Sequence, residues 1–303
     1  MGDLPRVGYI GVGLMGHGAA KHIIETGGYP LTVMGHRNRA PVEDLVARGA
    51  REARSPAEIA RASDVLFLCL PSAVEVEATV YGEGGVLEGA HAGMILVDST
   101  TSDPNLTRRV GADLAARGGA MVDAALGRTP KEAEEGRLST YLGGEPEAIE
   151  RVRPILESFA DTIIVCGPLG AGTTAKLVNN CIAISTCAII AEAFATAAKL
   201  GVELETLTQV VEAGGANSRM FQMMKPWLLE GDDSHLKGPL RIAAKDMRFY
   251  NQMAEGAPAP AVIAAAVSQV YRLVNLQGHG ERFMPTLPGI LAGWAGAKIH
   301  ELD

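Results

Sequence analysis

The chain has 303 residues, 47% of them hydrophobic, and a net charge of −8 when the histidines are counted as neutral. That length is enough for two domains with a substantial core, and the negative charge argues against a surface that binds nucleic acid or an anionic membrane. Four cysteines form no CxxC pair and seven histidines form no ligand cluster, so we expect reduced thiols, a cytoplasmic location and no bound metal.

A glycine-rich loop follows the first expected strand. Its members are Gly11, Gly13, Leu14, Met15 and Gly16, between a strand expected over residues 6–10 and a helix expected over residues 18–25. In this context the Gly-x-Gly-x-x-Gly pattern is a specific signal for dinucleotide binding. Gly11 allows the tight turn, Gly13 lets the backbone approach a pyrophosphate, and Gly16 lets the helix pack closely on the strand. The helix N-terminus then presents N–H groups to the phosphates. A merely structural turn is the alternative.

The second expected strand, residues 30–34, indicates which dinucleotide is bound. In such folds an acid near the end of this strand accepts hydrogen bonds from ribose hydroxyls, whereas an arginine accommodates a 2′-phosphate. The residues after Gly35 are His36, Arg37, Asn38 and Arg39, and no acid appears before Glu43. The two guanidiniums predict a preference for NADP(H), with NAD(H) as a second option. The alternative is that both arginines are ordinary surface charges.

Two later strand ends carry residues that can reach the same cofactor. Leu70 and Pro71 end the strand expected over residues 65–70, and Thr100 and Thr101 follow the strand expected over residues 94–98. Ligands of parallel sheets bind at the carboxyl ends of the strands, so we expect a loop over the cofactor and hydroxyls near its nicotinamide ribose or carboxamide. Capping of the next helix explains the hydroxyls equally well.

The whole segment up to residue 166 alternates apolar runs with amphipathic ones. Further strands are expected over residues 120–124 and 162–166, with residues 141–142 as a candidate short strand, and further helices over residues 41–47, 56–62, 73–80, 105–117 and 146–159. This alternation predicts an α/β fold, a Rossmann-like doubly wound parallel sheet covered by helices on both faces.

After residue 166 the pattern becomes helical and stays so to the C-terminus. A Gly/Pro run over residues 167–172 separates the two regimes, so we expect a dinucleotide-binding domain over residues 1–166 and an all-helical domain for substrate and subunit contacts over residues 167–303. The segment 177–200 is apolar enough to suggest a membrane span, but Asn180, Glu192 and Lys199 are costly in lipid. We expect a helix over residues 173–200, buried between the domains, and no membrane partner.

Lys176 and Asn180 are four residues apart on that helix and therefore share a face. A lysine on an apolar helix is costly unless it faces a cavity or a charge. Burial lowers the pKa of a lysine toward neutrality, which suits a general acid or base. The alternative is a solvated lysine near a helix start.

These motifs together resemble the β-hydroxyacid dehydrogenases, a family that includes 3-hydroxyisobutyrate dehydrogenase and tartronate semialdehyde reductase. The resemblance rests, in order along nearly the whole chain, on residues 9–16, 70–71, 98–101, 170–172, 176–180 and 245–246. It implies an active site between a Rossmann-like and a helical domain, with Lys176 as the acid/base and Asn180 as its neighbour. It also implies Lys245 near the cofactor, Thr101 rather than Thr100 as the cofactor contact, and a homodimer or homotetramer.

The substrate loop departs from the usual family pattern of Asp-Ala-Pro-Val-Ser-Gly-Gly. Residues 123–129 read Asp-Ala-Ala-Leu-Gly-Arg-Thr, so Gly127 stands where the family has serine, and Arg128 and Thr129 follow. This loop is similar to that of the sulfolactaldehyde reductases, in which the arginine grips a sulfonate. With Asn179, these residues are the candidate substrate contacts. This chain departs from those relatives in two ways. Ala183 stands where they carry serine, and they use NADH, whereas this chain is expected to prefer NADP(H).

The resemblance and the motifs predict an NADP-preferring oxidoreductase that interconverts a small anionic 3-hydroxy acid and its semialdehyde. Candidate substrates carry a carboxylate or a sulfonate: sulfolactaldehyde, succinic semialdehyde, 3-hydroxyisobutyrate or tartronate semialdehyde. Lys176 would exchange the hydroxyl proton and Arg128 would hold the acid group. The alternatives are an imine reductase-like enzyme and a catalytically silent dinucleotide-binding module, and the presence of Lys176 counts against both.

Overall fold

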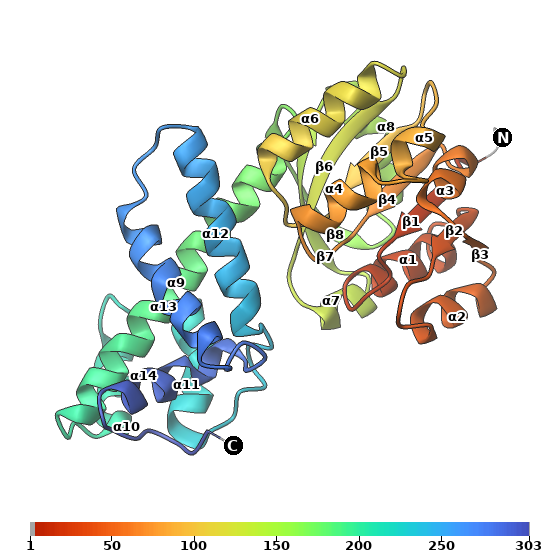
Figure 1. The fold of residues 1–303 in the computed structure, drawn as a ribbon. Helices are drawn as coiled ribbons and strands as arrows, with labels where there is room; N and C mark the ends of the chain where they lie inside the picture. The colour runs from red at the N-terminus through yellow and green to blue at the C-terminus, as the bar shows by residue number, and fades with distance from the viewer. Residues whose placement is uncertain (1–3, 303) are drawn as a thin grey trace. The chain divides into compact units, whose positions relative to one another are not determined.

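The computed structural model describes residues 4–302, and the chain divides into two compact units, one ending at Lys176 and one beginning at Leu177. The first unit is built on an eight-stranded sheet with the order β3-β2-β1-β4-β5-β6-β7-β8 (Figure 1). The strands are β1 Val7–Ile10, β2 Leu31–Met34, β3 Arg51–Ala53, β4 Val65–Leu68, β5 Ile95–Asp98, β6 Ala120–Gly127, β7 Leu138–Gly144 and β8 Ala160–Gly167. The Rossmann-like sheet expected from the sequence is confirmed.

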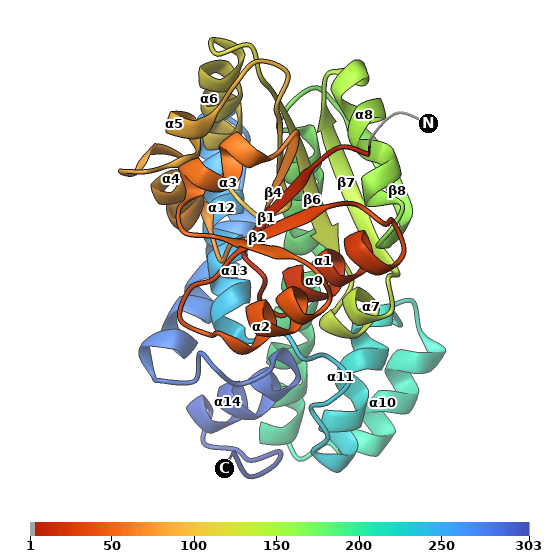
Figure 2. The ribbon, with the colours of Figure 1, turned by 90° about the vertical axis from the view of Figure 1, so that its right-hand side faces the viewer.

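Eight helices of the first unit connect these strands. They are α1 Gly16–Glu25, α2 Ala40–Ala47, α3 Pro56–Ala62, α4 Ala73–Tyr81, α5 Val86–Gly89, α6 Pro104–Ala115, α7 Pro130–Glu134 and α8 Pro146–Leu156. Figure 2 shows α3 to α6 on one face of the sheet and α1 and α8 on the other. On the second face, α1, α2 and α8 bury their apolar sides on one cluster that includes Tyr9 and Phe67, whose rings stack at 5.6 Å.

The sheet differs from the expectation in two places. β3 was missed because it is only three residues long and two of them are exposed charged residues. β7 is longer than the candidate strand at residues 141–142, and it runs antiparallel to β6, so the sheet is not wholly parallel. A parallel return normally needs a crossover of a dozen or more residues. The connection here holds only the five-residue helix α7.

The second unit is helical throughout its described part, as expected. Its elements are the rest of α9 (Ala171–Lys199), then α10 Leu204–Ala213, α11 Arg219–Glu230, α12 Leu240–Gly256, α13 Val262–Leu276, η1 Met284–Thr286 and α14 Leu287–Trp294. Within residues 4–302, α9 is the helix long and apolar enough to cross a membrane. Ile184, Cys187 and Ala191 of this helix are buried in the core of the second unit, and Tyr271 of α13 donates a hydrogen bond to the Ile184 carbonyl at 3.0 Å.

Candidate active site

Of the three glycines in the loop between β1 and α1, Gly13 alone faces open space. Gly11 has a φ of +98°, and a Cβ placed on it would lie 2.1 Å from the Cys69 carbonyl oxygen. A Cβ on Gly16 would lie 2.1 Å from the Gly11 carbonyl oxygen, whereas a Cβ on Gly13 would meet nothing within 4 Å. Gly11 and Gly16 therefore hold the loop together. Gly13 leaves open space beside the first turn of α1, which fits the pyrophosphate of a dinucleotide. Leu14 is 81% exposed.

The residues after β2 are exposed and are not all available to a ligand. Arg39 donates to both carboxylate oxygens of Glu52, at 2.7 and 2.9 Å. Asn38 accepts the Ala40 N–H at 3.3 Å. Arg37 makes no hydrogen bond or ion pair with the residues that the structure describes, so its guanidinium is available to an anion. The ion pair of Arg39 was missed by sequence reasoning because Glu52 lies on the unpredicted strand β3.

The loops after β4 and β5 are fastened to each other by Thr100. Its hydroxyl accepts the Leu70 N–H at 3.0 Å, its own N–H donates to Asp98 Oδ1 at 2.9 Å, and its side chain is buried. Thr100 therefore supports the loop at Leu70 and Pro71 instead of facing a ligand, while Thr101 is partly exposed. The capping alternative is also wrong for these hydroxyls, because Asp103 caps α6. Burial raises the pKa of Asp98 to about 7.

The loop expected to bind substrate leaves β6 through a left-handed turn at Arg128, whose φ is +73°. The Arg128 guanidinium donates to Asp161 Oδ2 at 2.7 Å, to Thr162 Oγ1 at 3.0 Å and to the Arg137 carbonyl oxygen. Thr129 forms a capping box with Glu132 at the start of α7. A Cβ on Gly127 would lie 2.3 Å from Ser139 Oγ, so the serine that is usual in related loops does not fit here unless Ser139 moves.

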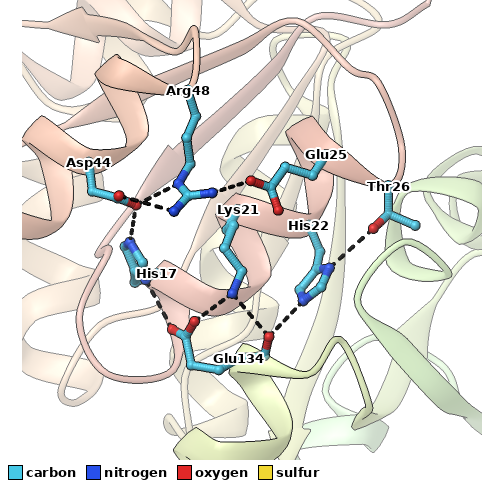
Figure 3. Close-up of polar contacts among 8 residues, drawn as sticks. All are labelled: His17, Lys21, His22, Glu25, Thr26, Asp44, Arg48 and Glu134. Atoms are coloured by element: carbon cyan, nitrogen blue, oxygen red, sulfur yellow. Dashed lines mark hydrogen bonds and ion pairs between the residues drawn. The ribbon is translucent and has the colours of Figure 1, made fainter.

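A clasp of polar side chains fastens α7 onto α1, the helix that follows the glycine loop (Figure 3). Lys21 donates to the Glu134 carboxylate at 2.6 Å and to its carbonyl oxygen at 3.0 Å, and Nε2 of His22 lies 3.0 Å from that same carbonyl oxygen. His17 bridges Glu134 on one side and Asp44 of α2 on the other, at 3.0 and 2.9 Å. The backbones approach closely, since a Cβ on Gly18 would lie 2.5 Å from the Ala133 backbone.

Asp123 was not singled out by sequence reasoning as a site residue, yet it anchors the helix that carries Lys176. Its carboxylate is buried and accepts the N–H groups of Gly170 at 2.7 Å and Thr173 at 2.6 Å, at the start of α9. An acceptor at a helix N-terminus satisfies otherwise unpaired N–H groups. Because Asp123 lies on β6, the same strand holds both the Arg128 loop and the first turn of α9. Burial raises the pKa of Asp123, and the backbone donors oppose that rise.

Lys176 lies half-buried on α9, and Asn180 follows it one turn later. Asn180 donates to Asp246 Oδ2 at 2.8 Å, and Lys245 Nζ lies 3.2 Å from Asp246 Oδ1, so Asp246 joins two predicted site residues. Asn179 is exposed and donates to Asn180 Oδ1 at 3.3 Å. Lys245 also lines a groove of about 910 Å³ between α12 and α13 with Arg241, Arg248 and Arg272.

Residues 4–302 contain no group of three histidine, cysteine, aspartate or glutamate side chains placed to hold a metal ion.

Comparisons with known proteins agree with this architecture. Residues 6–167 match the NAD binding domain of 6-phosphogluconate dehydrogenase, and residues 170–284 match the NAD-binding model of NADP-dependent 3-hydroxyisobutyrate dehydrogenase. The chain is 28% identical to 2-(hydroxymethyl)glutarate dehydrogenase of Eubacterium barkeri over 97% of each protein. It is 30% identical to 3-sulfolactaldehyde reductase of Escherichia coli K12 over 92% of this chain and 93% of that one.

A solved structure of 3-hydroxyisobutyrate dehydrogenase from Salmonella typhimurium superposes with a TM-score of 0.79 at 26% identity, covering 94% of this chain and 99% of that one. Fold, glycine loop and both family models thus agree along nearly the whole sequence. The chain belongs to the β-hydroxyacid dehydrogenase family, and it is an NAD(P)-dependent oxidoreductase of hydroxy acids and semialdehydes.

Proposed function

We propose that this enzyme reversibly reduces a small semialdehyde bearing a carboxylate or a sulfonate, and that it prefers NADP(H). The observation that carries the proposal is the use of one strand, β6, to hold both the Arg128 loop and, through Asp123, the helix start that carries Lys176. The proposed anion-binding residue, Arg128, and the proposed proton-transfer residue, Lys176, thus both lie on segments attached to β6. Relatives named for 2-(hydroxymethyl)glutarate and for 3-sulfolactaldehyde support an acidic substrate.

Lys176 is the proposed proton-transfer residue. A nicotinamide held by the glycine loop would supply the hydride to the aldehyde carbon during reduction and accept it from the carbinol carbon during oxidation. Lys176 gives its proton to the aldehyde oxygen during reduction and takes it back from the hydroxyl during oxidation. Asn180, held by Asp246, orients Lys176 and the substrate. Asn179, Gly127 and Thr129 complete the proposed substrate contacts. Imine reduction is not favoured, because the presence of Lys176 counts against it.

Arg128 is the proposed partner of the acid group. A guanidinium binds a carboxylate or sulfonate through two parallel hydrogen bonds, which lysine cannot do. In the structure Arg128 is already paired with Asp161, so the substrate anion must compete with or replace this carboxylate. Competition of this kind favours substrates whose acid group carries a full charge.

The preference for NADP(H) is supported by Arg37. This arginine is exposed at the end of β2, where dinucleotide-binding folds recognise the adenosine ribose. A 2′-phosphate there would gain charge-assisted hydrogen bonds from Arg37. The remaining proposed cofactor contacts are Gly11, Gly13, Leu14, Met15, Gly16, His36, Asn38, Leu70, Pro71, Thr101 and Lys245.

The enzyme is further proposed to be a cytoplasmic homodimer or homotetramer, with the region after residue 166 supplying the substrate and subunit contacts. Ile182 and Ile189 of α9 are 66% and 62% exposed, seven residues apart and thus on one face of the helix. Large exposed apolar side chains that share a face are typical of subunit contacts. Light scattering of the purified protein checks the mass.

The decisive experiment replaces Lys176 by alanine and follows oxidation of NADPH with a panel of anionic semialdehydes. General acid/base catalysis contributes about 10²–10⁴-fold, so kcat should fall by that factor. Binding of NADPH should change little, because the glycine loop holds the pyrophosphate. The matched control is Lys199→Ala at the exposed far end of the same helix, which should keep its kcat. Near wild-type turnover in Lys176→Ala would remove the mechanism, and silence of the wild type toward the whole panel would favour a non-catalytic dinucleotide-binding protein.

A further inference from the structure

Glu52 brings a carboxylate to the end of β2 from the neighbouring strand β3. It is paired in register with Val33 of β2, and its two oxygens accept the terminal nitrogens of Arg39 at 2.7 and 2.9 Å. Such a two-pronged pair fixes both planes and orients both side chains. The Arg39 guanidinium lowers the pKa of the Glu52 carboxyl, so this group is ionised near neutral pH.

The ion pair packs against Gly35, the residue that directly follows β2. A Cβ on Gly35 would lie 2.2 Å from Arg39 Nη1 and 3.0 Å from Glu52 Oε1. The pair therefore occupies the space that a side chain at this position would fill. In dinucleotide-binding folds the position about 20 residues after the glycine loop carries the acid that accepts hydrogen bonds from the adenosine ribose. Glu52 places a carboxylate there although the sequence position itself has none.

The chemistry of this arrangement is different for the two cofactors. A carboxylate accepts hydrogen bonds from the free ribose hydroxyls of NAD(H), but it repels a 2′-phosphate. Arg39 has both terminal nitrogens on Glu52, so these two donor groups are already engaged. Arg37, which lies directly after β2, is a cation paired with no described residue.

We propose that Glu52 determines cofactor specificity in this enzyme, by accepting the adenosine ribose hydroxyls of NAD(H) and by withholding Arg39 from the 2′-phosphate of NADP(H). This inference rests on the proposed function, because it assigns the ribose subsite of the same cofactor site. The preference for NADP(H) is then a balance in which Arg37 favours the phosphate and Glu52 opposes it. Glu52 keeps NAD(H) usable.

The test is the dissociation constant of NADPH and of NADH, measured by cofactor fluorescence, in the wild type and in Glu52→Gln. Removing the carboxylate releases Arg39 toward the phosphate and weakens the acceptor for the ribose. We expect NADPH to bind tighter and NADH to bind weaker, with the ratio of the two constants moving at least about tenfold toward NADPH, the size of one hydrogen bond to a charged group.

Glu43→Gln is the matched control. Glu43 Oε1 lies 4.0 Å from Arg39 Nε, so this substitution also removes one negative charge from beside Arg39, but Glu43 forms no two-pronged pair with it. Its cofactor ratio should change less than about twofold. Equal shifts in the two variants would show a general charge effect and overturn the inference.

Arg39→Met provides a second, independent arm in case Glu52→Gln disturbs β3. This variant leaves Glu52 without its partner, so NADPH should bind more weakly while NADH is retained. A wild type that binds neither cofactor contradicts the proposed function itself. Binding of both cofactors, with a ratio that neither Glu52→Gln nor Arg39→Met changes, contradicts only the role of Glu52.

Discussion

The glycine loop after β1 and the substrate loop after β6 leave the same edge of one sheet, yet they are held by different forces. The first is fixed by backbone contacts: Gly11 and Gly16 have no room for a side chain. The second is fixed by side chains that come from distant segments, as when Arg128 pairs with Asp161. A loop fixed by backbone sterics keeps one geometry for a constant ligand, the pyrophosphate. A loop fixed by ion pairs can change its ligand by changing a few charges.

The largest effect that would sharpen this comparison is expected from Arg128→Lys. The variant keeps the charge and the left-handed backbone of a non-glycine residue, but it loses the two-pronged hydrogen bond to an anion. We expect a higher KM for the anionic semialdehyde and a loss of about 2–5 kcal/mol in kcat/KM, with NADPH binding intact. Steady-state kinetics with NADPH in excess measure this loss.

Asp161→Asn is the companion variant, since it releases Arg128 without removing it. The KM for the anionic substrate should stay equal or fall. Unchanged kinetics in Arg128→Lys would mean that the loop does not bind the acid group at all.

The next effect concerns Asp98, a buried carboxyl at the end of β5 that accepts the Thr100 N–H. Its pKa is about 7 in the folded protein and near 4 when unfolded. The folded state thus holds a proton that the unfolded state has lost, and this contribution to stability falls as pH rises from about 4 to 7. The total fall is about 4 kcal/mol, constant above pH 7.

Asp98→Asn should remove that slope from the free energy of unfolding, measured by urea denaturation at several pH values. Asp64→Asn serves as the comparison, because Arg6 lowers the pKa of Asp64 and its titration lies below this window. If the slope between pH 4 and 7 is the same in Asp98→Asn as in the wild type, the carboxyl at Asp98 titrates normally.

The smallest expected effect separates the two kinds of glycine within the first loop. Gly16→Ala forces a Cβ to 2.1 Å from a backbone oxygen, so the free energy of unfolding should fall by about 1–3 kcal/mol. Gly13→Ala meets no atom within 4 Å, so stability should stay within about 0.5 kcal/mol while NADPH binding weakens. Urea denaturation and cofactor titration of both variants test this. Equal destabilisation by the two substitutions would contradict the division of roles.

The sequence was informative where a structure depends on neighbours along the chain. The glycine loop, six strands and the shared face of Lys176 and Asn180 follow from local patterns: steric demands of a turn, buried apolar runs and helical spacing. β3 escaped because Arg51 and Glu52 are exposed and charged, and its pairing with β2 is a tertiary contact.

Side-chain pairing over long separations was the part that local patterns could not predict. Three hydrogen bonds show this. Asp123 binds the N–H of Thr173, fifty residues later in the sequence. The bond between Asn180 and Asp246 spans sixty-six residues, and the bond between Arg128 and Asp161 spans thirty-three. Each pair depends on how strands and helices pack against one another. A short stretch of sequence does not determine that packing. These pairs decide whether a predicted binding arginine is available. For Arg39 and Arg128, that distinction became visible only in the folded chain.

The contacts between α1 and Glu134 allow the loop after β6 to change its sequence while its attachment to α1 is kept. Lys21 and His22 both contact the Glu134 carbonyl oxygen, and Lys21 also donates to the Glu134 carboxylate. A substitution at position 134 removes the carboxylate but keeps the main-chain oxygen. Residues between β6 and Glu134 can therefore be exchanged during evolution, or by loop grafting in the laboratory, while the docking point on α1 stays in place. A lineage can in this way acquire a new substrate without rebuilding the part of the sheet that binds its cofactor.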